Sequence, residues 1–255
     1  MVGAASPFSF NGVRRLGVSG SGDVYDALIA SGIFARTDPA VVSELSKRLE
    51  PVRFPPGHVI DAQCGFHGHV YVIISGKIEL TFRRAEGYQI GLTILGPSQI
   101  FGAKTLFDPD SSGFTLAALT EVEAVPIARS QLLTWMAERP EIGEQLLRLF
   151  ARWAKQTASA MVDFALADAR SRTASRLLML SRRFGRRDGE LVRVEHDMAL
   201  TDFALLVGVA PHVADSALRE FAQRGWIRLE EQTVVIADMQ ALKSAQAGGT
   251  IAPRT

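Results

Sequence analysis

The stretch LVGVAPHVADSALREFAQRGWI, residues 206–227, decides the fold because it predicts a helix, a tight turn and a second helix. Pro211 suits the start of that second helix, since the first helical residue needs no backbone N–H and proline fixes φ near the helical value. Apolar residues that can pack the two helices together recur through the stretch: Val207, Val209, Val213, Ala217, Leu218 and Phe221. The spacing therefore predicts an intact helix-turn-helix.

The segments around this pair complete a small domain of helices and strands. The sequence LVRVEHD, residues 191–197, reads as a strand, and GWIRLEEQTVVIAD, residues 225–238, reads as a two-stranded hairpin. Helices followed by such a hairpin are typical of a winged helix-turn-helix. The last residues, 246–255, are rich in glycine and small residues and are expected to form a frayed tail.

A long amphipathic helix precedes this domain. After SQLLTWMAERP, residues 130–140, apolar positions recur at spacings of four and three, which predicts a coiled-coil-like seam on a helix of over twenty residues. At about 1.5 Å per residue it extends over roughly 30 Å. A buried core helix is the alternative, but its place after a complete β-rich region favours a dimer seam. The expected seam residues are Ile142, Leu146, Leu149, Trp153, Ala160 and Phe164.

The first half of the chain changes character along its length. Residues 1–22 are rich in Gly, Ser and Ala and are expected to be a flexible extension, with docking of its few apolar residues on the body as the alternative. Residues 23–50 suggest two short helices. From 52 to 128, short β-rich runs alternate with Gly and Pro, which predicts a sandwich or barrel.

Composition excludes several functions. The 255 residues are 47% hydrophobic and 22% charged with a net charge of +1, so any attraction to nucleic acid must come from local clusters. The single cysteine, Cys64, fits a reducing cytoplasm. We see no signal peptide, no apolar run long enough to span a membrane, and no nucleophile–base pattern of an enzyme.

The order of a β-rich domain, a long helix and a winged helix-turn-helix resembles the cyclic-AMP receptor protein (CRP/FNR) family of bacterial transcription regulators. The stretches YVIISGKIEL, LTILGPSQIFG and ERPEIGEQLLRLFAR carry the likeness together with residues 206–230, and it covers about residues 23–240. It implies an α+β fold with a β-roll like a cyclic-nucleotide-binding jelly roll at 23–137, a dimerisation helix at 138–165 and a winged helix-turn-helix at 166–245. It also implies a homodimer, double-stranded DNA as partner and RNA polymerase as a further partner.

The ligand pocket departs from the family pattern. In the family, a Glu after Phe-Gly binds the ribose and an Arg about ten residues later binds the cyclic phosphate. Phe101 and Gly102 match, but Ala103 replaces the Glu, and Ser112 and Gly113 replace the Arg and the hydroxyl residue that follows it. Each lost charge-assisted hydrogen bond, about 1.5–3 kcal/mol, weakens binding about tenfold or more. We therefore expect weak or absent cyclic AMP binding and no other cofactor.

Three further positions near this pocket have alternative readings. Thr157 on the long helix matches a family contact to adenine. Lys104 could supply a cation for another anion, or it could be a solvated surface lysine. The segment CGFHGH could place Cys64 as a redox-sensitive thiol or a metal ligand, although a fourth zinc ligand is not evident, and a solvated loop is the alternative.

The DNA-reading positions have changed in the same way. The family motif runs Ser-Arg-Glu-Thr-Val-x-Arg/Lys, and this chain has Ala, Pro, His, Val, Ala, Asp and Ser at 210–216. His212 and Ser216 remain as possible base readers. Asp215 repels phosphates, while Arg219 and Thr201 are placed for phosphate contacts.

Positive charge is instead concentrated upstream. Residues 170–193 hold eight arginines and two acids. Four of the eight cluster around Gly185, which predicts a phosphate-binding loop: Arg182, Arg183, Arg186 and Arg187. The leading interpretation is a DNA-binding regulator with a degenerate cyclic-AMP site. The alternatives are an interaction protein that pairs with an intact relative, and a sensor of a different small ligand.

Overall fold

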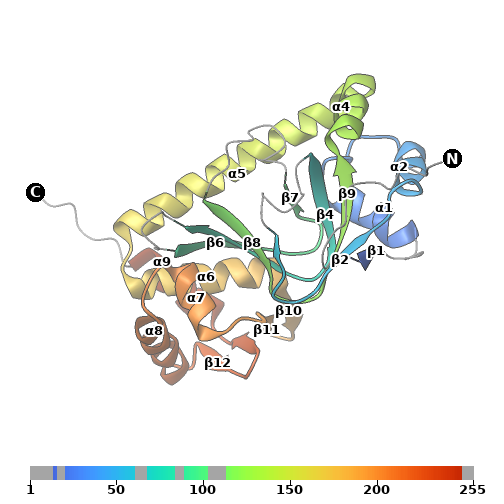
Figure 1. The fold of residues 1–255 in the computed structure, drawn as a ribbon. Helices are drawn as coiled ribbons and strands as arrows, with labels where there is room; N and C mark the ends of the chain where they lie inside the picture. The colour runs from blue at the N-terminus through green and yellow to red at the C-terminus, as the bar shows by residue number, and fades with distance from the viewer. Residues whose placement is uncertain (1–13, 16–20, 61–67, 84–88, 103–112, 249–255) are drawn as a thin grey trace, which may run out of the picture. The chain divides into compact units, whose positions relative to one another are not determined.

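The computed structural model describes residues 14–15, 21–60, 68–83, 89–102 and 113–248 (Figure 1). The chain divides into two compact units, one of residues 1–87 with 94–151 and the other of residues 88–93 with 152–255. The expected order of a β-rich domain, a long helix and a helix-turn-helix with a sheet is confirmed.

Two sheets form the β-rich domain. One has the strand order β1-β2-β9-β4-β7 and the other has the order β3-β8-β5-β6. Their bounds are β1 (Arg14–Arg15), β2 (Val52–Phe54), β3 (Val59–Ile60), β4 (His69–Ser75), β5 (Ile78–Arg83), β6 (Gln89–Leu95), β7 (Ile100–Phe101), β8 (Phe114–Ala118) and β9 (Val122–Ala128). The helices α1 (Ser21–Ala30) and α2 (Pro39–Ser46) precede the sheets, as expected.

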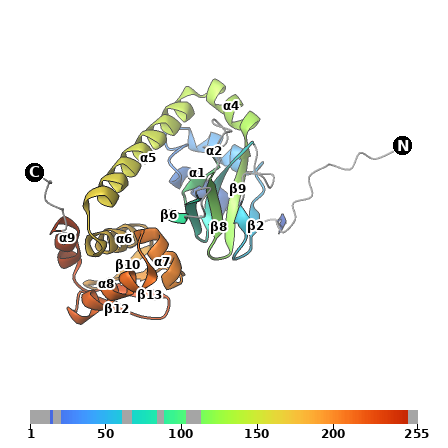
Figure 2. The same ribbon diagram turned by 60° about the vertical axis from the view of Figure 1, so that its left-hand side comes forward.

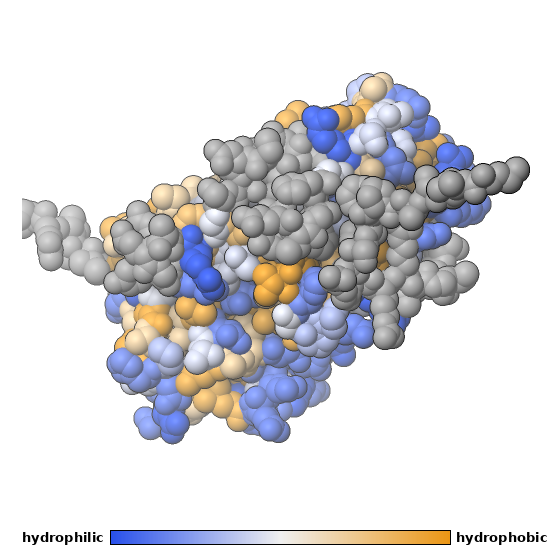
Figure 3. Space-filling view, viewed as in Figure 1, coloured by the Kyte–Doolittle hydropathy of each residue, from blue (hydrophilic) through white to orange (hydrophobic). Residues whose placement is uncertain are grey.

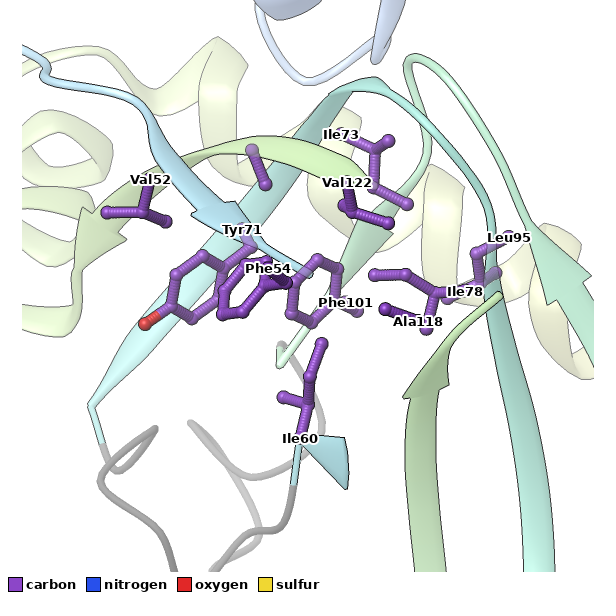
Figure 4. Packing of buried hydrophobic residues seen from close by; sticks show 11 residues of the cluster. Val52, Phe54, Ile60, Tyr71, Ile73, Ile78, Leu95, Phe101, Ala118 and Val122 are labelled. Atoms are coloured by element: carbon purple, nitrogen blue, oxygen red, sulfur yellow. The ribbon is translucent and has the colours of Figure 1, made fainter. Parts of the chain in front are cut away.

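Buried apolar side chains from both sheets fill the interior of the β-rich domain. Figure 4 shows the rings of Phe54, Tyr71 and Phe101 lying side by side at its centre, with Ile60 beneath them. The rings of Tyr71 and Phe101 stack 4.8 Å apart with 8° between their planes. Since these residues come from β2, β4 and β7, one aromatic cluster joins three strands of the same sheet.

The turn between β4 and β5 shows why glycine recurs at these positions. Gly76 has φ +89°, and an added Cβ there would lie 2.2 Å from the carbonyl oxygen of Glu121. A side chain at this position would be strained both by the backbone conformation and by the crowding.

Two helices follow the sheets. Helix α4 (Arg129–Glu138) ends just before Pro140, and α5 (Pro140–Leu166) then runs for 27 residues, as its periodicity predicts. At about 1.5 Å per residue α5 is about 40 Å long.

The second unit contains the remaining helices and a third sheet (Figure 2). Helix α6 (Ala169–Phe184) is followed by β10 (Gly185–Asp188) and β11 (Leu191–Glu195), and then by α7 (Leu200–Val207) and α8 (Pro211–Gln223). The strands β12 (Ile227–Leu229) and β13 (Thr233–Ile236) form the expected hairpin, and the sheet order is β10-β11-β13-β12.

A final helix, α9 (Met239–Gly248), was not expected from the sequence. It packs against α6, where the Ser171 hydroxyl donates to the carbonyl oxygen of Ala245 at 2.8 Å and the Gln246 amide donates to the Ser175 hydroxyl at 3.2 Å. Residues 246–248 therefore belong to this helix, and their prediction as part of the terminal tail is wrong.

The amino-terminal extension contributes one described element. Arg14 and Arg15 form β1, which pairs antiparallel with Arg53 and Val52 of β2. The apolar residues for which docking was the alternative, Phe8, Phe10, Val13 and Leu16, lie outside the described residues.

Candidate nucleic-acid interface and ligand pocket

The helix-turn-helix is built as the opening sequence stretch predicts. Helix α7 ends at Val207 and is capped by Gly208, whose φ of +75° is the left-handed conformation that suits a helix C-terminus. Helix α8 begins at Pro211, with Ala210 as its N-cap in an extended conformation and without a side-chain cap. The buried residues that join the two helices include Val207, Ala217, Leu218 and Phe221, while Val209 and Val213 are half-buried.

The candidate reading residues are accessible at the start of α8. The side chains of His212 and Ser216 are both exposed. Arg219 is also exposed, but its Nε lies 2.7 Å from the Asp215 carboxylate one turn earlier. This i,i+4 pair shields the acid that the sequence placed as a source of phosphate repulsion, and it occupies the arginine.

Helix α7 presents one candidate phosphate contact. Thr201 is exposed in the first turn, where its hydroxyl donates to the Asp202 carboxylate at 3.5 Å. Backbone N–H groups at a helix start attract anions. At the start of α7 the Asp202 carboxylate already supplies such an anionic partner, because it accepts from the Ala199 N–H at 3.2 Å.

The four arginines around Gly185 do not form a loop. Arg182 and Arg183 lie in the last turn of α6, and Arg186 and Arg187 lie on β10, which is paired with β11. Successive side chains of a strand project to opposite faces of its sheet. Arg186 and Arg187 therefore project to different faces.

Arg183 differs from the other three because it is half-buried. Its guanidinium donates to the Thr93 hydroxyl at 2.6 Å, and both residues belong to the second unit. Burial, followed by repulsion from Arg182 and Arg176, lowers the pKa of Arg183. The other three guanidinium groups are exposed, and no ion pair joins them to any part of the chain that the structure describes.

The strand register reveals a basic row that the sequence did not predict. Arg186 is opposite Arg193, which is opposite Val235, which is opposite Arg228 on β12. These residues share one face of the sheet because they lie in one cross-strand row. Arg193 is paired with Glu230, whereas Arg186 and Arg228 are exposed. The alternation of side chains along one strand does not show that Arg228 lies in the same row as Arg186. The order of the strands in the sheet is needed for that.

Three of the eight arginines in residues 170–193 act inside the unit. Arg172 and Arg176 lie 5.5 and 5.1 Å from the centre of the Phe164 ring. Arg170 pairs with Glu220 at 3.0 Å and lies 5.3 Å from the ring of Trp226. Part of the positive charge of this segment therefore serves packing within the unit, where these arginines connect α6 to α5 and α8.

The candidate ligand pocket is described only in part. Phe101 is buried within the aromatic cluster, and Gly102 has φ +82° with the carbonyl oxygen of His69 2.6 Å from the position of an added Cβ. Gly113, with φ +87°, lies against the ring of Phe82 in the same way. Ala103, Lys104 and Ser112 lie outside the described residues, as does Cys64.

Burial raises the pKa of the Tyr71 phenol in this interior. The phenol therefore stays neutral at physiological pH and supplies no negative charge. The described ring cluster consists of apolar and aromatic side chains, which offer stacking surfaces.

The expected dimer seam needs revision at two positions. Ile142 is fully buried and Leu146 is 2% exposed within the chain itself, so neither side chain is available to a second copy. Leu149, Trp153, Ala160 and Phe164 are half-buried, and Thr157 is exposed.

A neighbouring row of α5 carries the exposed apolar side chains. We call it the α5 stripe, and it recurs at spacings of four, three, four, three and four: Leu147, Ala151, Ala154, Ala158, Met161 and Ala165. Leu147 is 70% and Met161 68% exposed. In Figure 3, hydrophobic residues in orange line the upper left edge, over the carboxyl-terminal half of α5.

Two negative findings apply to the described residues. No cluster of three or more His, Cys, Asp or Glu side chains among them could hold a metal ion. None of the described helices is long and apolar enough to cross a membrane.

Comparisons with known proteins agree with this architecture. Residues 51–139 match the cyclic nucleotide-binding domain, and residues 171–245 match the Crp-like helix-turn-helix domain. A CRP-like cAMP-activated global transcriptional regulator of Mycobacterium tuberculosis is 41% identical over 217 residues, which are 85% of this chain and 97% of the relative. The cyclic AMP receptor protein of Thermus thermophilus is 26% identical over 195 residues, 76% of this chain and 87% of that protein.

Solved structures show the same fold. FixK2 of Bradyrhizobium japonicum superposes with a TM-score of 0.69 at 17% identity, covering 77% of this chain and 96% of that chain. The c-di-GMP-responsive regulator CLP of Xanthomonas campestris gives a TM-score of 0.64 at 18% identity, covering 78% of this chain and 99% of that chain.

Proposed function

Since the chain belongs to the CRP/FNR family of DNA-binding transcription regulators, which are not enzymes, we propose that it acts as a cytoplasmic homodimer with little or no dependence on cyclic AMP. Its DNA affinity rests mainly on arginines outside α8. The observation that carries this proposal is a contrast between two surfaces. The arginines Arg182, Arg186 and Arg187 are exposed and in no described ion pair, whereas Arg219 on α8 is paired with Asp215.

Phosphate contacts by these arginines explain how a chain of net charge +1 can bind DNA. Arginine matches phosphate geometry with two parallel hydrogen bonds, and each contact releases a counterion from the DNA. Arg228 on β12 adds a further exposed cation to the same sheet as Arg186. Arg183 contributes less, because its hydrogen bond to Thr93 and its burial hold it away from solvent.

Salt dependence tests this proposal. The affinity of the full-length protein for a long duplex should fall steeply with salt, and the triple change Arg182→Ala, Arg186→Ala and Arg187→Ala should flatten the logarithmic slope by up to about three units per protomer. The matched control removes three exposed cations of the first unit: Arg36, Lys47 and Arg48. Equal slopes for the wild type and the first triple variant would refute the role of these arginines.

The homodimer is supported by the α5 stripe. A stripe of small and apolar residues at heptad spacing allows two helices to pack closely. Burying Leu147 and Met161 in an interface would stabilise the dimer, by about 1.5–3 kcal/mol for each side chain that becomes fully buried. Sedimentation equilibrium at micromolar concentration should therefore show twice the mass of one chain.

Weak cyclic AMP binding is supported by the residue types at 103 and 112. Neither Ala103 nor Ser112 can pair with an anion or fix a ribose hydroxyl by charge. Calorimetric titration of the full chain with cyclic AMP should show no binding in the low micromolar range. Binding in the low micromolar range would refute this part of the proposal without affecting the DNA result.

A second candidate is an interaction protein that heterodimerises with an intact family member and reads no DNA itself. The lack of an unpaired arginine in the first turns of α8 favours it. It is separated from the main proposal by one measurement. Failure to bind any duplex at 50 mM salt supports the second candidate, and tight salt-sensitive binding supports the first. A third alternative is a sensor of another small ligand. It differs from both candidates because its affinity for DNA would change when that ligand is added.

A further inference from the structure

We propose that α8 reads thymine, through contact of Ala210 and Pro211 with the C5-methyl group. This inference rests on the proposed function, because it assigns a base preference to the same helix. Four side chains are exposed between the end of α7 and the second turn of α8. Ala210, Pro211, His212 and Ser216 are exposed, whereas Ala214 and Ala217 are buried.

The carboxylate and guanidinium side chains of α8 are already in ion pairs. Asp215 is paired with Arg219 at 2.7 Å. Glu220 is paired with both Arg170 and Arg224 at 3.0 Å. The surface available to a base edge is therefore two apolar residues, one imidazole and one hydroxyl.

The major groove presents a different chemical pattern for each base. Guanine is best met by the two donors of Arg or by Lys, adenine by the amide of Asn or Gln, and cytosine by an acceptor from Glu or Asp. The exposed tip of α8 has none of these side chains without an ion pair. Thymine alone offers an apolar group, and Ala and other apolar side chains contact it.

The geometry of the helix start places these two residues first. A recognition helix enters the groove with its amino-terminal residues nearest the base edges. Pro211 is the first residue of α8 and Ala210 is its N-cap, with φ −66° and ψ 148°. Both are rigid or small, so contact with a methyl group orders no flexible side chain and loses little conformational entropy.

His212 and Ser216 can add hydrogen bonds to the base edges but do not determine which base is preferred. Each can donate to or accept from several base edges, so neither distinguishes one base by itself. The methyl contact is therefore the discriminating element, and one such contact is made by each protomer of the dimer.

Replacement of thymine by deoxyuridine tests the inference, because it removes only the methyl group. The full-length protein is first used to select duplexes from a random library. One synthetic duplex of the selected sequence is then compared with its deoxyuridine form. We expect thymine in both half-sites and a loss of affinity of about fourfold per methyl, or about 16-fold for two.

Variants connect the loss to the residues. Pro211→Ser keeps a residue that is accepted at a helix start but removes the apolar ring, so it should reduce the preference for the thymine duplex to the part that Ala210 supplies. An unchanged preference would contradict the contact by Pro211. Pro39→Ser, the same change at the start of α2 in the first unit, is the matched control and should keep the preference. Retained affinity of Pro211→Ser for random duplex shows that the variant is folded.

The outcomes separate the two proposals. Equal affinity of the wild type for both duplexes, or selection of sites without thymine, overturns the inference and leaves the proposed DNA binding intact. No binding to any duplex at low salt overturns the proposed function and the inference with it.

Discussion

The ring of Phe164, near the end of α5, lies directly against Gly208 in the turn of the helix-turn-helix. A Cβ atom added to Gly208 would be 2.4 Å from Cε1 of Phe164. Arg172 and Arg176 stand on the same ring, and Arg176 also donates from Nε to the carbonyl oxygen of Leu206 at 2.9 Å. The end of α5 is thereby packed onto the residues that set the angle between α7 and α8.

Gly208→Ala should lower the free energy of unfolding of the second unit by about 2–5 kcal/mol. About 1–2 kcal/mol comes from the left-handed φ of +75°, and about 1–3 kcal/mol comes from overpacking against Phe164. Hydrogen exchange of the amides of α7 and α8 measures the loss. In a Phe164→Ala background the same change should cost only the backbone strain. Equal costs in both backgrounds would contradict the contact.

Arg176→Met should destabilise the second unit by about 1–3 kcal/mol, because it leaves the Leu206 carbonyl at the end of α7 without this donor in a buried site. Urea denaturation followed by circular dichroism measures the change. Arg182→Met, an exposed change on the same helix, is the control and should stay within about 0.5 kcal/mol of wild type. A similar loss for both variants would show that Arg176 is not a buried anchor.

Tyr71 should make folding stability depend on pH above 10. Burial raises the pKa of its phenol above the unfolded value of about 10, so the folded chain keeps the proton that the unfolded chain releases. This contribution is complete below pH 10 and is lost as pH rises, by up to about 1.4 kcal/mol per pH unit. Denaturation of Tyr71→Phe between pH 9 and 11 should show a flatter dependence. The same slope for both proteins would contradict the effect of burial.

Met161→Glu should dissociate the proposed dimer, because it places one negative charge on the α5 stripe of each protomer and the two charges face each other across the interface. Gln156→Glu adds the same carboxylate to an exposed position of α5 outside the stripe and is the matched control. Sedimentation equilibrium should give the mass of one chain for Met161→Glu and of two chains for Gln156→Glu. A dimeric Met161→Glu protein would place the interface elsewhere.

These results show where sequence periodicity suffices and where it does not. The 4-3 spacing correctly predicts α5, but several adjacent rows of one helix satisfy that spacing. Ile142 and Leu146 turn out to face the interior of their own chain, while Leu147 and Met161 are exposed. Only the packing of the surrounding elements determines which row faces outward.

The arginine segment illustrates a second limit. The cluster of arginines around Gly185 predicts a loop, yet Arg186 and Arg187 lie on β10, which pairs with β11 across a turn at Gly189, with φ +61°.

Helix α9 does carry local signals, since Asp238 caps its start by accepting from the Ala241 N–H at 2.8 Å and its residues are mostly strong helix formers. Its burial against α6, as at Ala245, is what the sequence does not show. Pro211, by contrast, was correctly placed because the start of α8 depends on local chemistry alone.

The positions of the three tryptophans make the protein its own spectroscopic probe. Trp135 is buried beside Phe34 in the first unit, Trp153 lies on α5, and Trp226 stacks on Phe221 in the second unit beneath Arg170. Variants that keep one indole at a time would emit from one region only. Fluorescence could then time the events in each region separately when DNA binds, without an attached dye.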